Sequence, residues 1–353
     1  MKPWMMAGLL WVAMIALPVG GSPADDPEMG WGTGTALGLN MAFTLEPLLQ
    51  LSGAPLADQD DTFIALRSLT GAAVHLPLYA YDVQAGLAFT AIQAASAGLL
   101  WASVYPMDHN WFVGGPATLL QSQIGGMYAN YEIYRHEQAA ARHLAEPVGV
   151  SWLDMLQAQF SWDVMQQPWV WVPAALGLGI SLATVPSDQA IWRTGNAYLG
   201  SWQMKPLFGT VLLSAVNLIN YSMVGIGEEA LYRGVIYEEL SRRVGLTWAK
   251  ILDAGLIFPL VHVPQYVSNG NSLESILMMY GFIATAGLVF DFAYDAGGLE
   301  LSSAAHMWMD FFYYTAMGLQ VFGAPLGDNK SNNQADLATI RLTPTGVQFS
   351  IAW

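Results

Sequence analysis

Residues 206–245 read PLFGTVLLSAVNLINYSMVGIGEEALYRGVIYEELSRRVG, and this stretch decides the fold class of the chain. The apolar run 206–225 is long enough for one membrane helix, which needs about 20 apolar residues. Glu228, Glu229 and Arg233 follow it directly. A charged side chain in hydrocarbon costs several kcal/mol unless it is paired or lines a wet cavity. The stretch therefore predicts a membrane helix that carries a polar site.

The pattern Glu-Glu-x-x-x-Arg occurs twice, at 228–233 and at 238–243. The second copy lies beyond the apolar run and is best interpreted as surface salt bridges between residues one helical turn apart. In the first copy Glu229 and Arg233 are also one turn apart and can neutralise each other. Glu228 is rotated by about 100° and has no helical partner of opposite charge. A buried structural pair explains Glu229 and Arg233 but not Glu228, whereas a general base needs such a free carboxylate.

The composition is that of a membrane protein. The 353 residues are 54% hydrophobic and only 11% charged, whereas soluble domains carry about 25% charged residues. The net charge of −15, with 12 Lys and Arg, argues against a nucleic-acid partner, because phosphate binding needs a basic face. The chain has no cysteine, so disulfide and thiolate chemistry are excluded.

Hydrophobic runs predict an all-α polytopic membrane protein with about six to nine membrane helices. The clear runs are 84–105, 168–185, 206–225, 251–267, 273–292 and 301–322, and the weaker ones are 34–51, 63–78 and 112–128. After residue 322 a polar linker leads to alternating apolar residues at 340–353, centred on 345–346. This alternation predicts a small C-terminal β-hairpin.

Two of the later apolar runs carry histidines. Phe258 and His262 are one helical turn apart and share a face. His306 and Asp310 have the same spacing, so Asp310 can hydrogen-bond to the imidazole and set its tautomer. Each pair alone is compatible with structural packing. Polar residues on chosen faces of three successive spans, however, predict one shared site.

The ordered motifs resemble those of the CAAX-protease and bacteriocin-processing family (CPBP, or Abi) of intramembrane proteases. They are Glu-Glu-x-x-x-Arg-Gly at 228–234, Phe-x-x-x-His at 258–262 and His-x-x-x-Asp at 306–310. The resemblance covers roughly residues 150–322. It implies an intramembrane endopeptidase that hydrolyses a peptide bond near the membrane surface by means of a glutamate-activated water molecule.

The resemblance also implies a role for each matched residue. Glu228 is the expected base, and His262 helps to hold and polarise the water. The remaining matched residues are Glu229 and Arg233, which support the site, His306 and Asp310, which face the developing oxyanion, and Phe258, which is expected to support His262.

Position 310 needs separate treatment, because the family has Asn or Asp there and this chain has Asp310. An ionised Asp310 would repel an oxyanion, whereas hydrogen-bond donors aimed at the oxyanion stabilise it. We therefore expect Asp310 to act indirectly, by orienting His306.

A zinc site is the alternative for the same side chains, because two His and one carboxylate form a familiar catalytic ligand set. Its ligands would be Glu228, His262 and His306. We favour a site with no cofactor and no metal, because the Glu-Glu helix lacks the paired His of a zinc protease.

The chain divides into four predicted regions. Residues 1–24 resemble a secretory signal peptide, with an uncleaved N-terminal anchor as the alternative. Residues 25–149 form an N-terminal membrane-associated region of unknown role, and within it 127–145 predicts a solvated polar helix. Residues 150–322 form the protease-like core, which begins with an interfacial helix, or one packed on the spans, at 152–171. Residues 323–353 are the linker and hairpin tail.

Two further functions compete with the protease. A non-catalytic membrane immunity or scaffold protein would keep the polar residues as a packing network. A transporter would use them as a midplane ionisable site, although no internal repeat supports this. The protease hypothesis implies a membrane-associated peptide or protein substrate and a lipid bilayer as partners. The signal-like N-terminus favours an integral protein of the bacterial cytoplasmic (inner) membrane.

Overall fold

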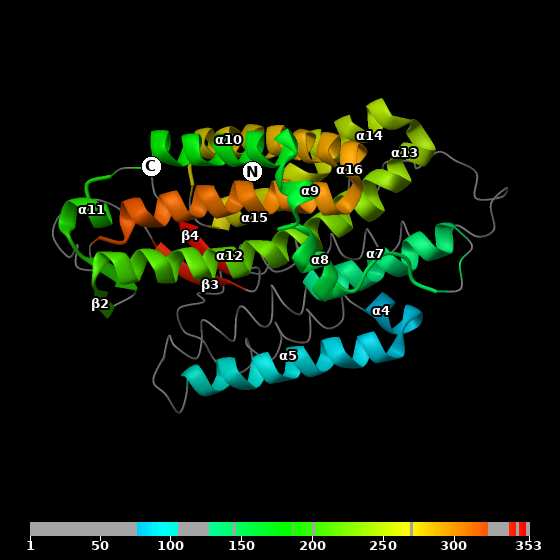
Figure 1. Ribbon diagram of the computed structural model, residues 1–353, viewed down its shortest axis with the longest axis horizontal. Helices are drawn as coiled ribbons and strands as arrows, with labels where there is room; N and C mark the ends of the chain where they lie inside the picture. The colour runs from blue at the N-terminus through cyan, green and yellow to red at the C-terminus, as the bar shows by residue number, and fades with distance from the viewer. Residues whose placement is uncertain are drawn as a thin grey trace.

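A computed structural model describes residues 76–104, 127–142, 144, 146–185, 187–199, 202–268, 271–323, 339–343 and 346–350. The predicted signal or anchor at 1–24 and the weaker spans at 34–51, 63–78 and 112–128 lie outside these residues, wholly or for most of their length. Within the described residues the protein is mostly helical (Figure 1).

The stretch that follows Lys205 is one long helical rod. Helix α12 (Pro206–Leu231) begins with proline at its first turn, where the missing N–H costs nothing. It continues without a break into the π-helix η2 (Tyr232–Tyr237) and then α13 (Glu238–Val244). Gly245, with φ of 83°, ends this rod. The predicted span 206–225 is thus confirmed as part of a longer helix that carries the first Glu-Glu motif.

The predicted span 251–267 is helical but built in three parts. Helix α14 (Leu246–Leu252) leads into a second π-helix, η3 (Asp253–Ile257), and then into α15 (Phe258–Ser268). Wide π turns are rare and are frequent at functional sites. Here η2 carries Arg233, and η3 begins at Asp253 and ends beside Phe258.

The predicted spans 273–292 and 301–322 are the two halves of α16 (Leu273–Val321). The helix breaks at Gly297 and Gly298, and Gly298 adopts a left-handed φ of 67°, which glycine reaches without steric cost. Phe282 stacks on Tyr313, and Phe290 stacks on His306. Both ring pairs are centred near residue 298, so the two halves of α16 run antiparallel, as Figure 1 also shows.

Helix α10 (Pro168–Thr184) lies along α16 (Figure 1). The expected continuous helix at 152–171 is wrong, because two short helices, α8 (Trp152–Ala158) and α9 (Trp162–Met165), precede α10. Ser161 accepts a hydrogen bond from the backbone N–H of Val164 and so caps a new helix. Pro168 then starts α10 at its first turn.

Helices α4 (Leu76–Tyr81), α5 (Val83–Val104) and α7 (Met127–Ala141) come from the N-terminal region. The interpretation of 127–145 as a solvated connector is wrong. Tyr131 and Ile133 are fully buried in α7, and a Cβ on Gly227 of α12 would lie 2.4 Å from that of Met127. Helix α7 is therefore a packed part of the core.

The strands form two small antiparallel hairpins. Strands β1 (Ala197–Leu199) and β2 (Trp202–Met204) follow the short helix α11 (Ile191–Thr194) and were not predicted. Strands β3 (Thr339–Thr343) and β4 (Gly346–Ser350) pair Ile340 with Phe349 and Leu342 with Val347. The C-terminal hairpin is thus confirmed, although Thr343 pairs with Gly346, so its centre lies one residue before the predicted 345–346.

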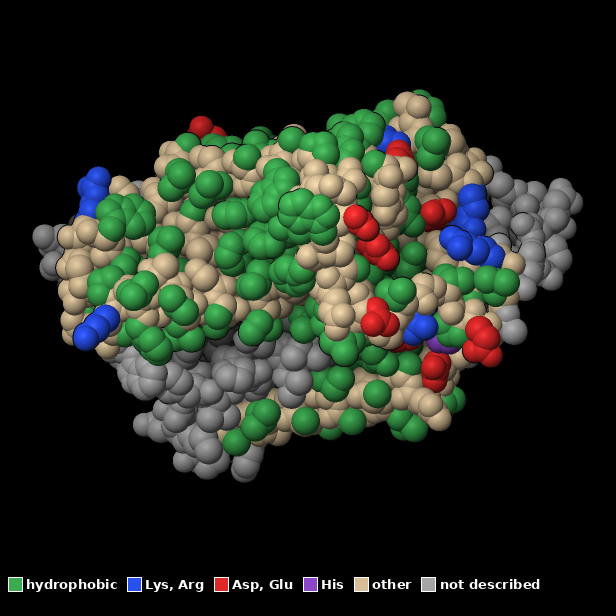
Figure 2. Space-filling view, in the orientation of Figure 1, with side chains coloured by type: hydrophobic (Ala, Val, Ile, Leu, Met, Phe, Trp, Pro, Cys, Tyr) green, Lys and Arg blue, Asp and Glu red, His purple; other side chains and the backbone are tan. Residues whose placement is uncertain are grey.

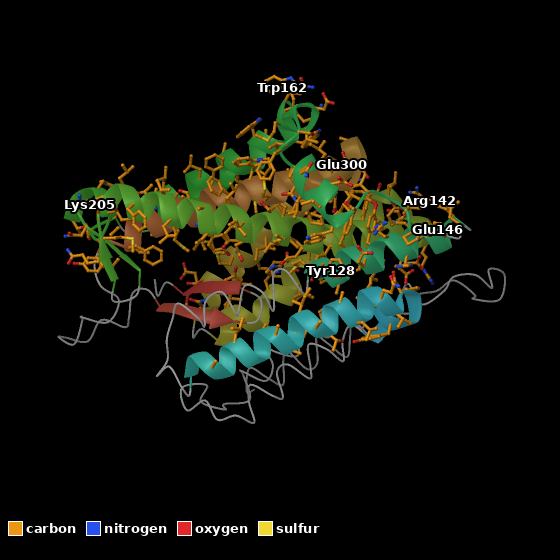
Figure 3. The ribbon with its side chains drawn as sticks, turned by 60° about the horizontal axis from the view of Figure 1, so that its bottom comes forward. Tyr128, Arg142, Glu146, Trp162, Lys205 and Glu300 are labelled. Atoms are coloured by element: carbon orange, nitrogen blue, oxygen red, sulfur yellow. The ribbon has the colours of Figure 1, made fainter. Side chains whose placement is uncertain are left out.

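Among the described residues, three helical segments are long and apolar enough to cross a membrane, namely Pro206–Val244, Leu246–Val263 and Leu273–Val321. Figure 2 shows hydrophobic side chains across the middle of one face and basic side chains at its two ends. Lys205 lies at one end, and Arg142 and Glu146 lie at the other (Figure 3). This distribution is that of an integral membrane protein, although the predicted total of six to nine helices is not established.

Candidate active site

The first Glu-Glu motif lies where α12 passes close to α16. A Cβ on Gly225 would lie 2.6 Å from the backbone oxygen of Ser303, so only glycine allows this approach of the two helices. Glu228 and Glu229 follow one turn later and face the second half of α16. The close approach therefore brings the motif to His306.

Arg233 of η2 is the centre of a fully buried polar network. Its Nη1 donates to Glu229 Oε1 at 3.1 Å, its Nη2 to the Gly287 carbonyl at 2.8 Å, and its Nε to Asp291 Oδ1 at 3.0 Å. Asp253 Oδ2 lies 3.6 Å from the same Nε. The side chains of Arg233 and all three acids are fully buried. The planar fork of arginine suits such divergent acceptors, which one lysine nitrogen cannot reach together.

Two phenylalanines enclose this network. The Arg233 guanidinium lies 4.4 Å from the ring centroid of Phe258 and 5.4 Å from that of Phe290. Phe290 also stacks on His306, with centroids 4.5 Å apart and an interplanar angle of 16°. The aromatic rings thus fix the guanidinium and the imidazole in one packed unit.

The His306 imidazole is surrounded by carboxylates. Its Nδ1 lies 2.8 Å from Glu229 Oε1, while its Nε2 lies 3.4 Å from Asp310 Oδ2 and 3.9 Å from Glu228 Oε2. A carboxylate acceptor requires the proton on Nδ1. Asp310 therefore approaches the imidazole as predicted, but Glu229 makes the hydrogen bond that fixes the tautomer. Sequence reasoning paired Glu229 with Arg233 alone.

His262 is held by the backbone of Phe258 rather than by the carboxylates that surround His306. Its Nδ1 lies 2.7 Å from the backbone oxygen of Phe258, which can only accept, so Nδ1 carries the proton. Its ring packs edge-on against Phe258, at 5.1 Å, and Phe258 packs in the same way against His306, at 6.0 Å. In the described part of the chain no hydrogen bond joins His262 to Glu228, and the Phe258 ring packs against both imidazoles.

Exposure separates the site into two layers. The side chains of Glu228 and Asp310 are each 15% exposed, whereas those of Glu229 and Arg233 are fully buried. Glu228 accepts no hydrogen bond from any described residue, whereas Asp310 lies against the Nε2 of His306. The partly exposed carboxylates of Glu228 and Asp310 thus both approach the Nε2 of His306, while Glu229 and Arg233 lie fully buried beneath them.

Comparison with known protein families gives a match in this part of the chain. Residues 210–312 match the family model described as type II CAAX prenyl endopeptidase Rce1-like. This match confirms the predicted family resemblance. No curated protein and no solved structure matches the chain. We call residues 210–312 the CAAX-protease segment; it contains every predicted site residue, from Glu228 to Asp310.

The CAAX-protease segment also contains polar residues that sequence reasoning missed. Asp253 and Asp291 hold the buried face of Arg233. Each is an acid inside an apolar stretch, which is the same signal that identified Glu228. The second Glu-Glu copy forms salt bridges on α13, and the predicted pair of Glu239 with Arg243 is confirmed. The expected pair of Glu238 with Arg242 is wrong, because Arg242 also pairs with Glu239 and Glu238 accepts a hydrogen bond from Tyr294.

The residues do not fit the alternative zinc site. No group of three or more His, Asp or Glu among the described residues has an arrangement that could hold a metal ion. Glu228 Oε2 lies 3.9 Å from the Nε2 of His306, but no hydrogen bond or ion pair joins His262 to either residue in the described part of the chain. We therefore derive no step through zinc.

Proposed function

We propose that this protein is an intramembrane endopeptidase in which Glu228 activates a water molecule. One observation carries the proposal: Glu228 is partly exposed and accepts no hydrogen bond from the described residues, while the adjacent Glu229 is fully buried and holds both Arg233 and His306. One acid is thus structural and the other is free, which is the arrangement that a general base needs.

The reaction follows from these positions. Glu228 takes a proton from water, and the hydroxyl oxygen adds to the carbonyl carbon of the substrate. The carbon–nitrogen bond then breaks, and Glu228 returns the proton to the leaving amine. His262 assists, because its protonated Nδ1 is bound to the Phe258 carbonyl, which leaves Nε2 free to accept a hydrogen bond from the attacking water.

His306 is assigned to the oxyanion. Glu229 holds the proton on Nδ1, so the ring donates from Nε2 only when it is doubly protonated, a charged state that the nearby carboxylates of Glu228, Glu229 and Asp310 stabilise. A fixed donor aimed at developing charge typically contributes about a hundredfold to a thousandfold in rate. Asp310 lies 3.4 Å from that Nε2 and orients the donor. Asp310 is a positioning residue in this scheme.

The depth of Glu228 sets where cleavage occurs. Glu228 lies ten residues before Glu238 of α13, which is about 15 Å along a helix. The pairs of Arg242 and Arg243 with Glu239 mark the polar end of that rod. This distance is about half of the ~30 Å hydrocarbon core for an upright rod and a shorter depth for a tilted one, so the scissile bond lies within the bilayer, and a membrane-associated peptide or protein is the substrate. We place the protein in the bacterial cytoplasmic membrane.

The direct test compares Glu228→Gln with Glu239→Gln in purified protein reconstituted in lipid nanodiscs. Both variants remove one acid of a Glu-Glu pair, but only Glu228 is in the site. With a degenerate peptide mixture and mass spectrometry of new termini, Glu228→Gln should lose at least about a hundredfold in rate, and Glu239→Gln should match wild type. Unchanged cleavage by a folded Glu228→Gln protein would refute the proposal.

The non-catalytic alternative has one observation in its favour. The buried network of Arg233, Glu229, Asp253 and Asp291 would tie the helices together whether or not the protein cleaves peptides. It gives no reason for an accessible Glu228. We also expect a chelator to leave cleavage unchanged; loss of activity that zinc restores would support the metal-dependent mechanism instead.

A further inference from the structure

We infer that Glu228 and Asp310, together with neighbouring tyrosine rings, form a subsite for a positively charged group of the substrate close to the scissile bond. The group is a lysine or arginine side chain or a free amino group. The inference rests on the proposed peptidase function and specifies which substrates the same site prefers.

The first support is an imbalance of charge. The polar cluster contains more acids than bases, because Arg233 and His306 are its only cations among the described residues. The acids that approach these two cations are Glu228, Glu229, Asp253, Asp291 and Asp310. Were all five acids ionised, the cluster would carry excess negative charge even with both bases charged, a state that burial opposes and that a bound cation would favour.

The second support is where that excess can be reached. Glu229, Asp253 and Asp291 are sealed around Arg233 with no exposed side-chain surface. Glu228 and Asp310 are each 15% exposed. An incoming cation therefore meets only these two carboxylates. Their free oxygens are charged acceptors, which make stronger hydrogen bonds than neutral ones.

The third support is an aromatic wall beside Asp310. Tyr313 and Tyr314 lie three and four residues after Asp310 on α16, so they share its helix face. Tyr314 stacks on Tyr221 of α12, with centroids 4.8 Å apart, and Tyr313 packs edge-on against Tyr314 at 4.9 Å. Tyr221 lies two turns before Glu228 on α12. Tyr221 and Tyr314 cover one face of each other, and Tyr313 also stacks on Phe282. Tyr221 and Tyr313 are buried, so the partly exposed Tyr314 is the ring of this group that can attract an ammonium or guanidinium group.

The subsite also removes a conflict in the mechanism. An ionised Asp310 close to His306 opposes the negative charge that develops on the carbonyl oxygen. A substrate cation seated on Asp310 offsets that repulsion when the reaction needs it. The preference should therefore be visible in kcat as well as in KM.

The experiment uses full-length protein in nanodiscs and peptides that differ at one residue. Lysine is compared with norleucine, and arginine with citrulline, at each position beside the cleaved bond. We expect at least about a tenfold higher kcat/KM for the charged member at one position, equivalent to about 1.4 kcal/mol. In Asp310→Asn this ratio should fall to within about twofold, and in Tyr314→Leu to an intermediate value.

The control is Asp188→Asn, whose side chain is 92% exposed and pairs with Arg193 away from the site. It should keep the wild-type ratio. Equal rates for charged and neutral peptides, or an undiminished ratio in Asp310→Asn, would overturn the inference. If cleavage depends on Glu228 but shows no charge preference, the subsite fails while the peptidase proposal stands.

A second measurement does not depend on cleavage. Thermal unfolding is followed with n-butylammonium chloride or with n-butanol plus the same concentration of sodium chloride. Binding to the folded state raises the melting temperature. The ammonium should stabilise wild type more than the alcohol does, and this difference should vanish in Asp310→Asn. The absence of any such difference in wild type would contradict the subsite even if no peptide were cleaved.

Discussion

Replacement of Arg233 by lysine keeps the positive charge but removes the fork that the buried network uses. Arg233 donates from three different nitrogens to Glu229, to the Gly287 carbonyl and to Asp291, at 2.8–3.1 Å. A lysine side chain has one nitrogen, which can satisfy at most the acceptors on one side. We therefore expect Arg233→Lys to leave two buried acceptors without their donor.

The magnitude follows from those two lost contacts. A buried acceptor without its partner costs about 1–3 kcal/mol, and more where the group is charged. Two such losses, with the guanidinium contact to the Phe258 ring at 4.4 Å, give about 3–5 kcal/mol of lost stability, within the range for breaking a buried ion pair. Release of Glu229 also frees His306, so peptidase activity should fall with stability.

The matched variant is Arg243→Lys on α13. Arg243 pairs with Glu239, but its side chain is 20% exposed and near the polar end of the rod. An exposed pair contributes about 1 kcal/mol or less, and lysine can keep it. Unfolding is measured for both variants by temperature and by denaturing detergent. A loss below about 1 kcal/mol for Arg233→Lys, or equal losses in both proteins, would refute the reasoning.

Two further predictions use other parts of the core. Gly225→Ala places a methyl group 2.6 Å from a backbone oxygen of α16 and should lower the stability of the protein by about 1–3 kcal/mol and reduce its activity. The control, Gly281→Ala, meets nothing within 4 Å and should leave the melting temperature unchanged or raise it. A larger loss of stability in Gly281→Ala than in Gly225→Ala would contradict the described packing. Burial lowers the pKa of His136 in α7 below 6.5, Arg135 adds to this shift, and Asp82 opposes it. Folded protein therefore binds this proton less tightly than unfolded protein, and stability should fall as the pH drops through about 6.5; His136→Gln should flatten the pH dependence of the melting temperature between about pH 7.5 and 5.5, and identical curves would count against the assignment.

The sequence predicted those features that a single local pattern encodes. Long apolar runs predicted the helices α10, α12 and α16, although α10, with 17 residues, is shorter than the helices that can cross a membrane. A one-turn spacing predicted the Glu229–Arg233 pair. The sequence also indicated the break of α16 at 297–298, because the runs 273–292 and 301–322 are each long enough for one membrane helix and are separated at this point. The alternation of apolar residues at 340–353 likewise predicted the C-terminal hairpin, but placed its centre one residue too late.

Features that depend on distant contacts escaped sequence reasoning. Asp253 and Asp291 are single acids in separate apolar stretches, and only the fold shows that both face Arg233. The helix expected at 152–171 followed hydrophobic spacing, but the serine cap at Ser161 and Pro168 restart the helix locally. Helix α7 has a polar composition, yet it is buried because glycines in α12 and η2, Gly227 and Gly234, admit its side chains.

The most direct test of the central claim follows the oxygen atom of water into the product. Wild-type protein and Glu228→Gln are incubated with a cleavable peptide in water enriched in oxygen-18. Hydrolysis by activated water predicts one heavy oxygen in the new carboxyl terminus with wild type and no new terminus above background with Glu228→Gln. Labelled product released at the same rate by Glu228→Gln would show that another group activates the water.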